Sequence, residues 1–328
     1  MKFSLFLFLL FTLLLTFKLN AQVLHVFTLG ESERNEKGSA AFVSLSDIYP
    51  SSEYKDSLAI PDLSYMGIER ASQFEYFILS SNYRRIFLNR INISESDKVF
   101  IYSYSKNKLI SFQVSDLNVV ACLNLYYARW PYFDNDYMIG FEIDKKHLID
   151  YEESFVTTLV CIGEKSPFVL NQMKPVAWRE IDIKDEPQVS IEKLIEVSLK
   201  SLNFDLSLSN EKLIKGKLYG YEQKELNYFV WNILSDAEVI NTYAKYYYVI
   251  NTLTKDTICQ ELIFDHESAS PALLNYVEDE YINQWTGSLF KNMPKVILGL
   301  EAVSFGCPRI KFLEVNKQDI DIQCDNRH

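Results

Sequence analysis

The sequence has little of the chemistry that familiar enzyme and metal motifs require. It contains four histidines (His25, His147, His266 and His328), and no two of them have the spacing of ligands on a zinc-binding helix. It has no Gly-x-Ser-x-Gly sequence, the turn that presents the nucleophile of α/β-hydrolases, and no EF-hand calcium loop. We therefore exclude a zinc site and expect no cofactor, and any catalytic site must form without a recognised motif.

Clusters of lysine and arginine are also absent. The chain has 33 basic and 44 acidic residues, which gives a formal net charge of −11 at pH 7. An acidic surface repels both the phosphates of nucleic acids and anionic lipids. We therefore expect no nucleic-acid partner, and we interpret the charge as a contribution to solubility.

Only one apolar run is long, and it lies at the start of the chain. Phe3–Phe17 carries no charge, Lys2 precedes it, and Ala21 follows shortly after. A basic start, a run shorter than the ~20 residues that span a bilayer, and a small residue at the cut predict a secretory signal peptide. We expect cleavage near Ala21, which removes Lys2 and Lys18 and changes the net charge from −11 to −13. The mature chain would be periplasmic or secreted, without an integral membrane segment.

Cysteine is scarce, and its number is odd. The five are Cys122, Cys161, Cys259, Cys307 and Cys324. In an oxidising compartment disulfides form, but an odd number leaves at least one cysteine without an internal partner. Ile320, Ile322 and Cys324 alternate onto one face of the C-terminal segment. A Cys307–Cys324 disulfide would fasten that segment and is our prediction; the alternative is that Cys324 is a buried thiol.

What the sequence does contain is alternation of apolar and polar residues with the period of a β-strand. The clearest example is 97–114, where two β-rich runs flank a polar Lys106-Asn107 turn and Ser105 would pair with Lys108. One face of this hairpin is then nearly all apolar, as in a sheet that covers a core. The expected cross-strand pairs on that face are Val99/Val114, Ile101/Phe112 and Ser103/Ile110.

The same patterns extend through the chain. We expect single strands at 23–29, 119–127, 137–143, 155–162, 176–183, 295–300, 309–315 and 320–324, and hairpins at 213–221/226–234 and 246–252/257–264. Helices are predicted after Ser80 or Ser81, after Ser190, and from Ser270-Pro271 to Thr286-Gly287. The polar stretch 30–62 is expected to be a long surface excursion.

The overall prediction is an α+β fold of predominantly antiparallel β-hairpins and meander with a few packed helices. A charged, proline-containing segment at 184–188 indicates a boundary. The organisation would be a signal peptide at 1–21, a strand-rich α+β domain at 22–186, and at 187–328 either a second α+β domain or a continuation of the first.

Three groups of residues are candidates for a site. Asp265-His266-Glu267 could belong to a hydrolase, although consecutive residues of a strand point to opposite faces, and capping of the next helix by Ser268 or Ser270 explains the cluster better. Asp134 and Asp136 could bind a hard cation, but Asp is also ordinary in a tight turn.

The third group is aromatic. Trp130, Tyr132, Phe133 and Tyr137 gather around one loop, where exposed rings could bind a protein, peptide or carbohydrate, unless they pack in the core. We expect an exported, non-enzymatic binding or envelope-associated protein that uses this loop. The alternatives are a hydrolase at residues 265–267 and a purely structural protein.

Overall fold

The computed structural model describes residues 24–33, 39–49, 67–124, 129–148, 156–182, 213–235, 242–275 and 283–326. Within these ranges the protein is mainly β-sheet, and α2 (Ser81–Arg90) is the one α-helix. The strand-rich, antiparallel part of the predicted fold is therefore confirmed. No helix among these residues is long and apolar enough to cross a membrane. The predicted signal peptide and the predicted helix after Ser190 lie outside the described residues.

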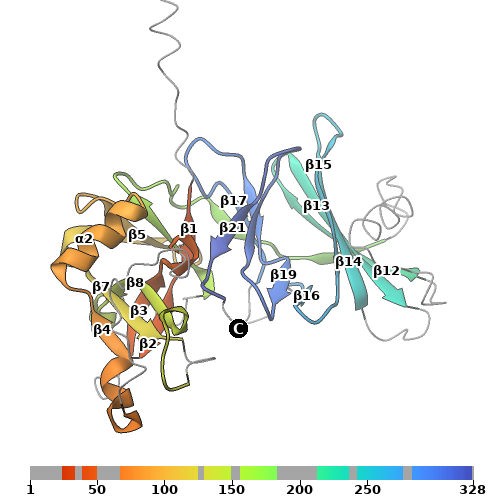
Figure 1. The fold of residues 1–328 in the computed structure, drawn as a ribbon. Coiled ribbons are helices and arrows are strands. Elements are labelled where there is room, and N and C mark those ends of the chain that lie inside the picture. The colour runs from red at the N-terminus through yellow and green to blue at the C-terminus, as the bar shows by residue number, and fades with distance from the viewer. Residues whose placement is uncertain are drawn as a thin grey trace, which may run out of the picture.

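A nine-stranded sheet runs through the centre of the molecule (Figure 1). Its order is β10 (Met173–Pro175), β17 (Trp285–Gly287), β18 (Val296–Leu298), β20 (Arg309–Phe312), β21 (Ile320–Gln323), β1 (Val26–Thr28), β9 (Thr158–Gly163), β5 (Lys98–Ser103) and β6 (Lys108–Gln113). All neighbours are antiparallel except β1 and β21, which are parallel. Strands from both sides of the predicted boundary at 184–188 thus pair in one sheet, and the number of domains stays a prediction.

The nine-stranded sheet curls so that its two ends approach each other. Tyr104, just after β5, packs edge-on against Trp285 of β17 with 5.7 Å between ring centroids, although five strands lie between β5 and β17 in the sheet. Phe168 bridges the curl, with centroids 5.1 Å from Tyr102 and 5.7 Å from Phe290. The concave face therefore encloses a core of its own.

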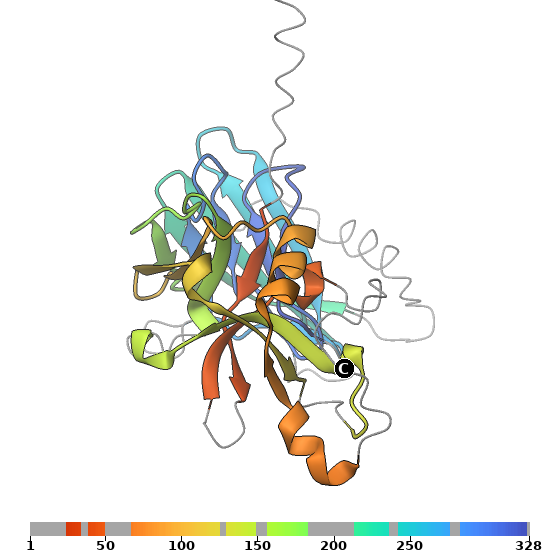
Figure 2. The same cartoon turned by 60° about the vertical axis from the view of Figure 1, so that its left-hand side comes forward.

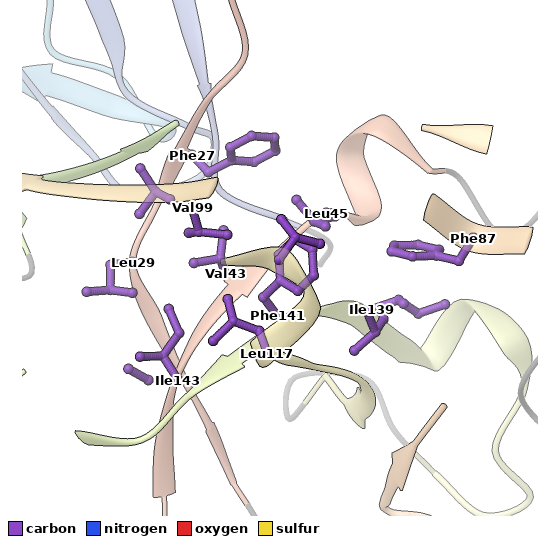
Figure 3. Close-up of a cluster of buried hydrophobic side chains, with 14 of the residues drawn as sticks. Phe27, Leu29, Val43, Leu45, Phe87, Val99, Leu117, Ile139, Phe141 and Ile143 are labelled. Carbon is purple, nitrogen blue, oxygen red and sulfur yellow. The ribbon is translucent and has the colours of Figure 1, made fainter. Parts of the chain in front are cut away.

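An N-terminal five-stranded sheet covers the outer face of β1, β5 and β9. Its order is β2 (Gly30–Glu33), β3 (Ser39–Ser44), β8 (Tyr137–Ile143), β7 (Asn118–Leu123) and β4 (Tyr76–Ile78). The core between the two sheets is largely aliphatic, and α2 contributes Phe87 and Leu88 to it (Figure 3). The hairpin β2–β3 corrects the prediction of a surface excursion for the first part of 30–62, and residues 50–62 lie outside the described ranges. The apolar run of this hairpin, Ala40–Val43, is buried. Because the run is short and polar residues flank it in the sequence, its pattern did not indicate a strand.

A second five-stranded sheet packs on the other half of the nine-stranded sheet, as Figure 1 and the rotated view in Figure 2 show. Its order is β11 (Arg179–Ile181), β12 (Leu213–Gln223), β13 (Leu226–Ser235), β14 (Thr242–Asn251) and β15 (Thr257–Phe264). Both predicted hairpins of this half, β12–β13 and β14–β15, are confirmed. A two-stranded ribbon of β16 (Ala269–Pro271) and β19 (Glu301–Val303) lies beside it.

The hairpin at 97–114 is confirmed, but its register differs from the prediction by two residues. Ile101 pairs with Ile110 and Val99 with Phe112, so the turn has four residues, because Tyr104 leaves the strand to pack on Trp285. A shift of two residues preserves which face each side chain occupies, and Ile101 is fully buried. The opposite face of β5 is buried too, since it forms part of the concave core.

The predicted helix from Ser270 to Gly287 is wrong in its described parts. Ser270 and Pro271 belong to β16, and the segment that should end the helix is β17. A buried polar network explains the extended chain. The Asn275 side chain donates to the carbonyls of Val176 and Gln284, and the Gln284 amide donates to the carbonyls of Leu273 and Gly299. Helical spacing of apolar residues was thus overridden by non-local hydrogen bonds.

The predicted disulfide between Cys307 and Cys324 is confirmed. It closes the chain between the start of β20 and the end of β21, with the two Cα atoms 5.5 Å apart. A disulfide of this kind is consistent with an oxidising compartment outside the cytoplasm. Cys161 is buried, and burial raises the pKa of its thiol.

Candidate functional site

The aromatic loop connects β7 to β8, and its described residues are 124 and 129–136. A short 3-10 helix, Asp134–Asp136, closes the loop: the backbone N–H of Phe133 donates to Asp136 Oδ2 at 2.8 Å, and the N–H of Asp136 returns to the Phe133 carbonyl at 2.9 Å. The side chain and backbone of Asp136 therefore both form hydrogen bonds within the turn. Within the described ranges, no three His, Cys, Asp or Glu side chains are placed to hold a metal ion, so the structure adds no support for a cation at Asp134 and Asp136.

Trp130 packs against Tyr132 and against the neighbouring 3-10 helix, Ile68–Phe74. Trp130 meets Tyr132 edge-on with 5.3 Å between centroids and lies 6.2 Å from Phe74. Trp130 and Tyr132 are half-buried, whereas Phe133 is 63% exposed. Phe133 thus projects into solvent, whereas Trp130 and Tyr132 are held by packing.

Tyr137 differs from the other three predicted residues because it is only 1% exposed. Its hydroxyl donates to the Phe74 carbonyl at 2.6 Å, and its ring contacts Tyr132 and Phe77. Burial raises the pKa of Tyr137, so the phenol stays a donor over the ordinary pH range. Tyr137 therefore supports the loop from beneath, and we correct its predicted role as a contact residue.

Polar groups lie beside the rings at this end of the N-terminal sheet. The Tyr132 hydroxyl lies 3.4 Å from Glu75 Oε1, and partial burial together with this carboxylate raises the pKa of Tyr132. The Arg70 guanidinium lies 5.6 Å from the centroid of the Phe74 ring. We call Trp130, Tyr132 and Phe133, with Arg70, the aromatic surface; Phe74 is buried beneath it. It offers an apolar face beside one cation and one carboxylate.

The predicted hydrolase residues lie in a tight turn between β15 and β16. Asp265, His266 and Glu267 are all exposed. His266 Nδ1 accepts from the backbone N–H of Ser268 at 3.2 Å, and His266 also pairs with Ala269 across the turn. The imidazole therefore has a local structural role. Catalysis by these residues stays a prediction, whereas capping of a helix by Ser268 or Ser270 is ruled out because β16 follows.

A chain of five alternating charges, which sequence reasoning missed, joins β15 to β20. In order, its members are Asp319, Lys311, Glu261, Arg309 and Glu301. The three closest pairs have N–O distances of 3.1–3.3 Å, and Arg309–Glu261 is 3.8 Å. Four of the five residues lie between 301 and 319, but Glu261 comes from β15, and local patterns carry no signal that joins the two stretches. Each charge faces an opposite one, which indicates an ion-pair network that joins the two sheets.

Burial affects the acids and bases of this network differently. Burial raises the pKa of Glu261 above its ordinary value, and the nearby Lys311 only partly offsets this. Burial also works against the charge on Lys311, but the carboxylates of Glu261 and Asp319 outweigh it and raise the Lys311 pKa. The network therefore keeps its cations charged, and Glu261 is protonated more easily than an ordinary glutamate.

The fold and the surface together define a mainly antiparallel, multi-sheet β protein with an exposed aromatic loop. Comparison with protein-family models, curated proteins and solved structures finds no match for this chain. The function must therefore be inferred from the geometry of the molecule itself.

Proposed function

We propose that this chain is an exported, non-enzymatic binding protein whose aromatic surface contacts its ligand. The observation that carries the proposal is the exposure of Phe133 in the same loop as rings that are already fixed. Trp130, Tyr132 and Tyr137 hold the loop, so contact with a ligand would cost little conformational entropy. The disulfide supports the exported location.

The chemistry of the surface favours a ligand with flat apolar faces and hydrogen-bonding edges. Aromatic rings stack on such faces, while Arg70 and Glu75 supply a donor and an acceptor at the edge. A carbohydrate chain combines both features and is the first ligand class to test. Peptides are the second class to test, because they also present apolar faces and hydrogen-bonding groups, over a smaller contact area.

The test is an array of oligosaccharides and peptides probed with the wild-type protein and with Phe133→Ala. We expect binding to at least one class of oligosaccharide and a loss of about tenfold or more in affinity for the variant, since a buried aromatic anchor typically contributes ~1–3 kcal/mol at an interface. Val315→Ala is the matched control, because Val315 is also an exposed apolar residue of a loop (58% exposed) and lies outside the aromatic surface.

Two outcomes would contradict the proposal. One is the absence of binding to either class by the wild-type protein. The other is equal binding by the wild-type protein and Phe133→Ala, which would place the contact elsewhere. If peptides bind and oligosaccharides do not, the binding function stands and its ligand class changes.

A further inference from the structure

A cavity of about 560 Å³ opens at one end of the aliphatic N-terminal core. It lies where the chain enters β1, where β9 ends, and where α2 is followed by a turn. Its volume falls within the range of small-molecule sites in proteins, about 300–1,000 Å³. It shares no residue with the aromatic surface, so a ligand site in this cavity would be independent of the proposed function.

The turn after α2 gives this cavity a fixed wall. Asn92 has a positive φ of 55°, which ends the helix, and the Ile93 N–H donates back to the Leu88 carbonyl at 3.0 Å. This pattern is a Schellman motif, in which a left-handed residue terminates the helix and satisfies its last carbonyls. The apolar residues on either side, Ile91 and Ile93, both pack against the core and line the cavity.

The floor of the cavity is apolar. Phe27 of β1 is buried there, and Ile48, Ile91, Ile93 and Ile162 are partly buried around it. These side chains offer an aliphatic body of matching size a large contact area, at roughly 25 cal/mol for each Å² removed from water. A fully polar molecule would gain nothing from this floor.

The polar residues of the cavity carry more negative than positive charge. Asp97 is half-buried, and its Oδ2 accepts from the Ser94 backbone N–H at 2.7 Å. Glu164 and Lys165 are exposed and contribute one charge of each sign. Partial burial lowers the pKa of His25, so its imidazole is largely neutral at neutral pH. The lining of the opening thus contains two carboxylates and one ammonium group.

We infer that this cavity binds an amphipathic amine, with its aliphatic body on the isoleucine floor and its ammonium group beside Asp97 and Glu164. The floor selects for an apolar body, and the excess of carboxylates selects for a cationic over an anionic head. This site is distinct from the aromatic surface and takes a different class of ligand.

The test uses three ligands with the same ten-carbon body: decylamine, decanol and decanoic acid, each below its aggregation threshold. Isothermal titration with the full chain is expected to give one site for decylamine, with an affinity at least tenfold higher than that of decanoic acid, and an intermediate value for decanol. Equal affinity for the amine and the acid, or no binding of any of the three, would overturn the inference.

Variants locate the site. Asp97→Asn is expected to weaken the binding of decylamine about tenfold, because its ammonium group loses a carboxylate. The affinity for decanol should be unchanged, because decanol binds mainly through its aliphatic body. Ile93→Phe should weaken both ligands by filling the cavity, whereas Leu253→Phe, at a turn residue that is 75% exposed, should affect neither. Full decylamine affinity in both cavity variants would place the amine elsewhere and overturn the inference.

A measurement on the wild-type protein guards against variants that fail to fold. A diazirine-bearing decylamine, activated by light and mapped by mass spectrometry, should label peptides that contain Ile91–Ile93 or Ile162–Lys165, and excess decylamine should suppress the labelling. Labelling confined to other peptides would overturn the assignment of the amine to this cavity.

Discussion

The two outer sheets bury their inner faces against the same nine-stranded sheet, yet they do so with different chemistry. The N-terminal interface is mostly aliphatic, with Val43, Val99, Ile139 and Ile143 among its fully or almost fully buried members. The C-terminal interface contains tyrosines, a buried lysine and the five-charge network. Similar architecture can therefore be stabilised by burial of apolar surface alone or by burial combined with polar contacts between sheets.

Polar groups in the C-terminal interface reach across to the neighbouring layer. The Tyr228 hydroxyl lies 2.9 Å from Thr286 Oγ1 of β17, and the Tyr247 hydroxyl is 3.4 Å from the Leu300 carbonyl. Lys245 donates to the Ala272 carbonyl, and burial lowers the pKa of Lys245 to about 8. The difference between the interfaces should therefore appear as a difference in their response to pH.

The largest expected effect comes from the aliphatic interface. Phe141→Ala removes a fully buried ring from β8 and should lower the free energy of unfolding by about 3–5 kcal/mol through the cavity it leaves. Because no titratable group is removed, the loss should be the same at pH 5 and pH 8 in urea denaturation. Ile78→Ala, in the same sheet but 59% exposed, is the control and should change stability by less than about 0.5 kcal/mol. A loss at Phe141 that depends strongly on pH would contradict the comparison.

A smaller, pH-dependent effect is expected from the charge network. Lys311→Met leaves Glu261 and Asp319 without their shared cation, and we expect a loss of about 2 kcal/mol at pH 7, below the 3–5 kcal/mol of a fully buried pair because the Lys311 side chain is 20% exposed. The loss should shrink as the pH falls.

The sign of this pH dependence is set by Glu261. Its pKa is higher in the folded than in the unfolded chain, so the folded state gains the proton first, and stability is lost as pH rises through that window. Lys311 lowers the pKa of Glu261, so its removal raises that pKa further and widens the pH range over which stability is lost. Urea denaturation from pH 4 to pH 8 measures this, with Lys217→Met, which breaks an exposed pair with Glu180, as the control. A loss that does not change with pH would indicate a packing role for Lys311.

The smallest expected effect is a gain in stability. Lys245 has a lower pKa in the folded chain, about 8, than in the unfolded chain, so below pH 8 its protonation costs the folded state up to about 3 kcal/mol. Lys245→Met removes this cost but also a hydrogen bond to Ala272, worth ~1 kcal/mol. We expect a net gain of about 1–2 kcal/mol at pH 7.

The gain from Lys245→Met should also disappear at high pH. Wild-type stability rises relative to the variant as pH increases above about 8, because neutral Lys245 no longer opposes folding. Denaturation at pH 7 and pH 9.5 compares the two. An equal difference at both values would show that the lysine is charged in the folded state and has a partner that holds it there.

The hairpins could be predicted from sequence because strand and partner lie close together along the chain. β12–β13 and β14–β15 show period-two alternation on both sides of a short turn, and both form. The register at 97–114 could not be predicted, since it depends on Tyr104 meeting Trp285 from a distant segment. The extended chain after Pro271 depends in the same way on hydrogen bonds to Val176 and Gly299.

The candidate site was predicted in part. The density of aromatic residues identified the loop, but burial of each ring depends on the tertiary contacts. The role of Tyr137 could have been found, because it shares its alternation with Ile139, Phe141 and Ile143, which all face the core. The isoleucine cavity gave no sequence signal, since its lining comes from four segments that are separate in the sequence.

The parallel pairing of β1 with β21 has a consequence for how the protein is made. Val26 lies opposite Ile322, so the polypeptide must be made at least as far as residue 322 before this seam can close. Until then the two halves of the central sheet each expose an open edge of unpaired backbone groups. Molecules that lack β21 should therefore keep both outer sheets while associating through these edges.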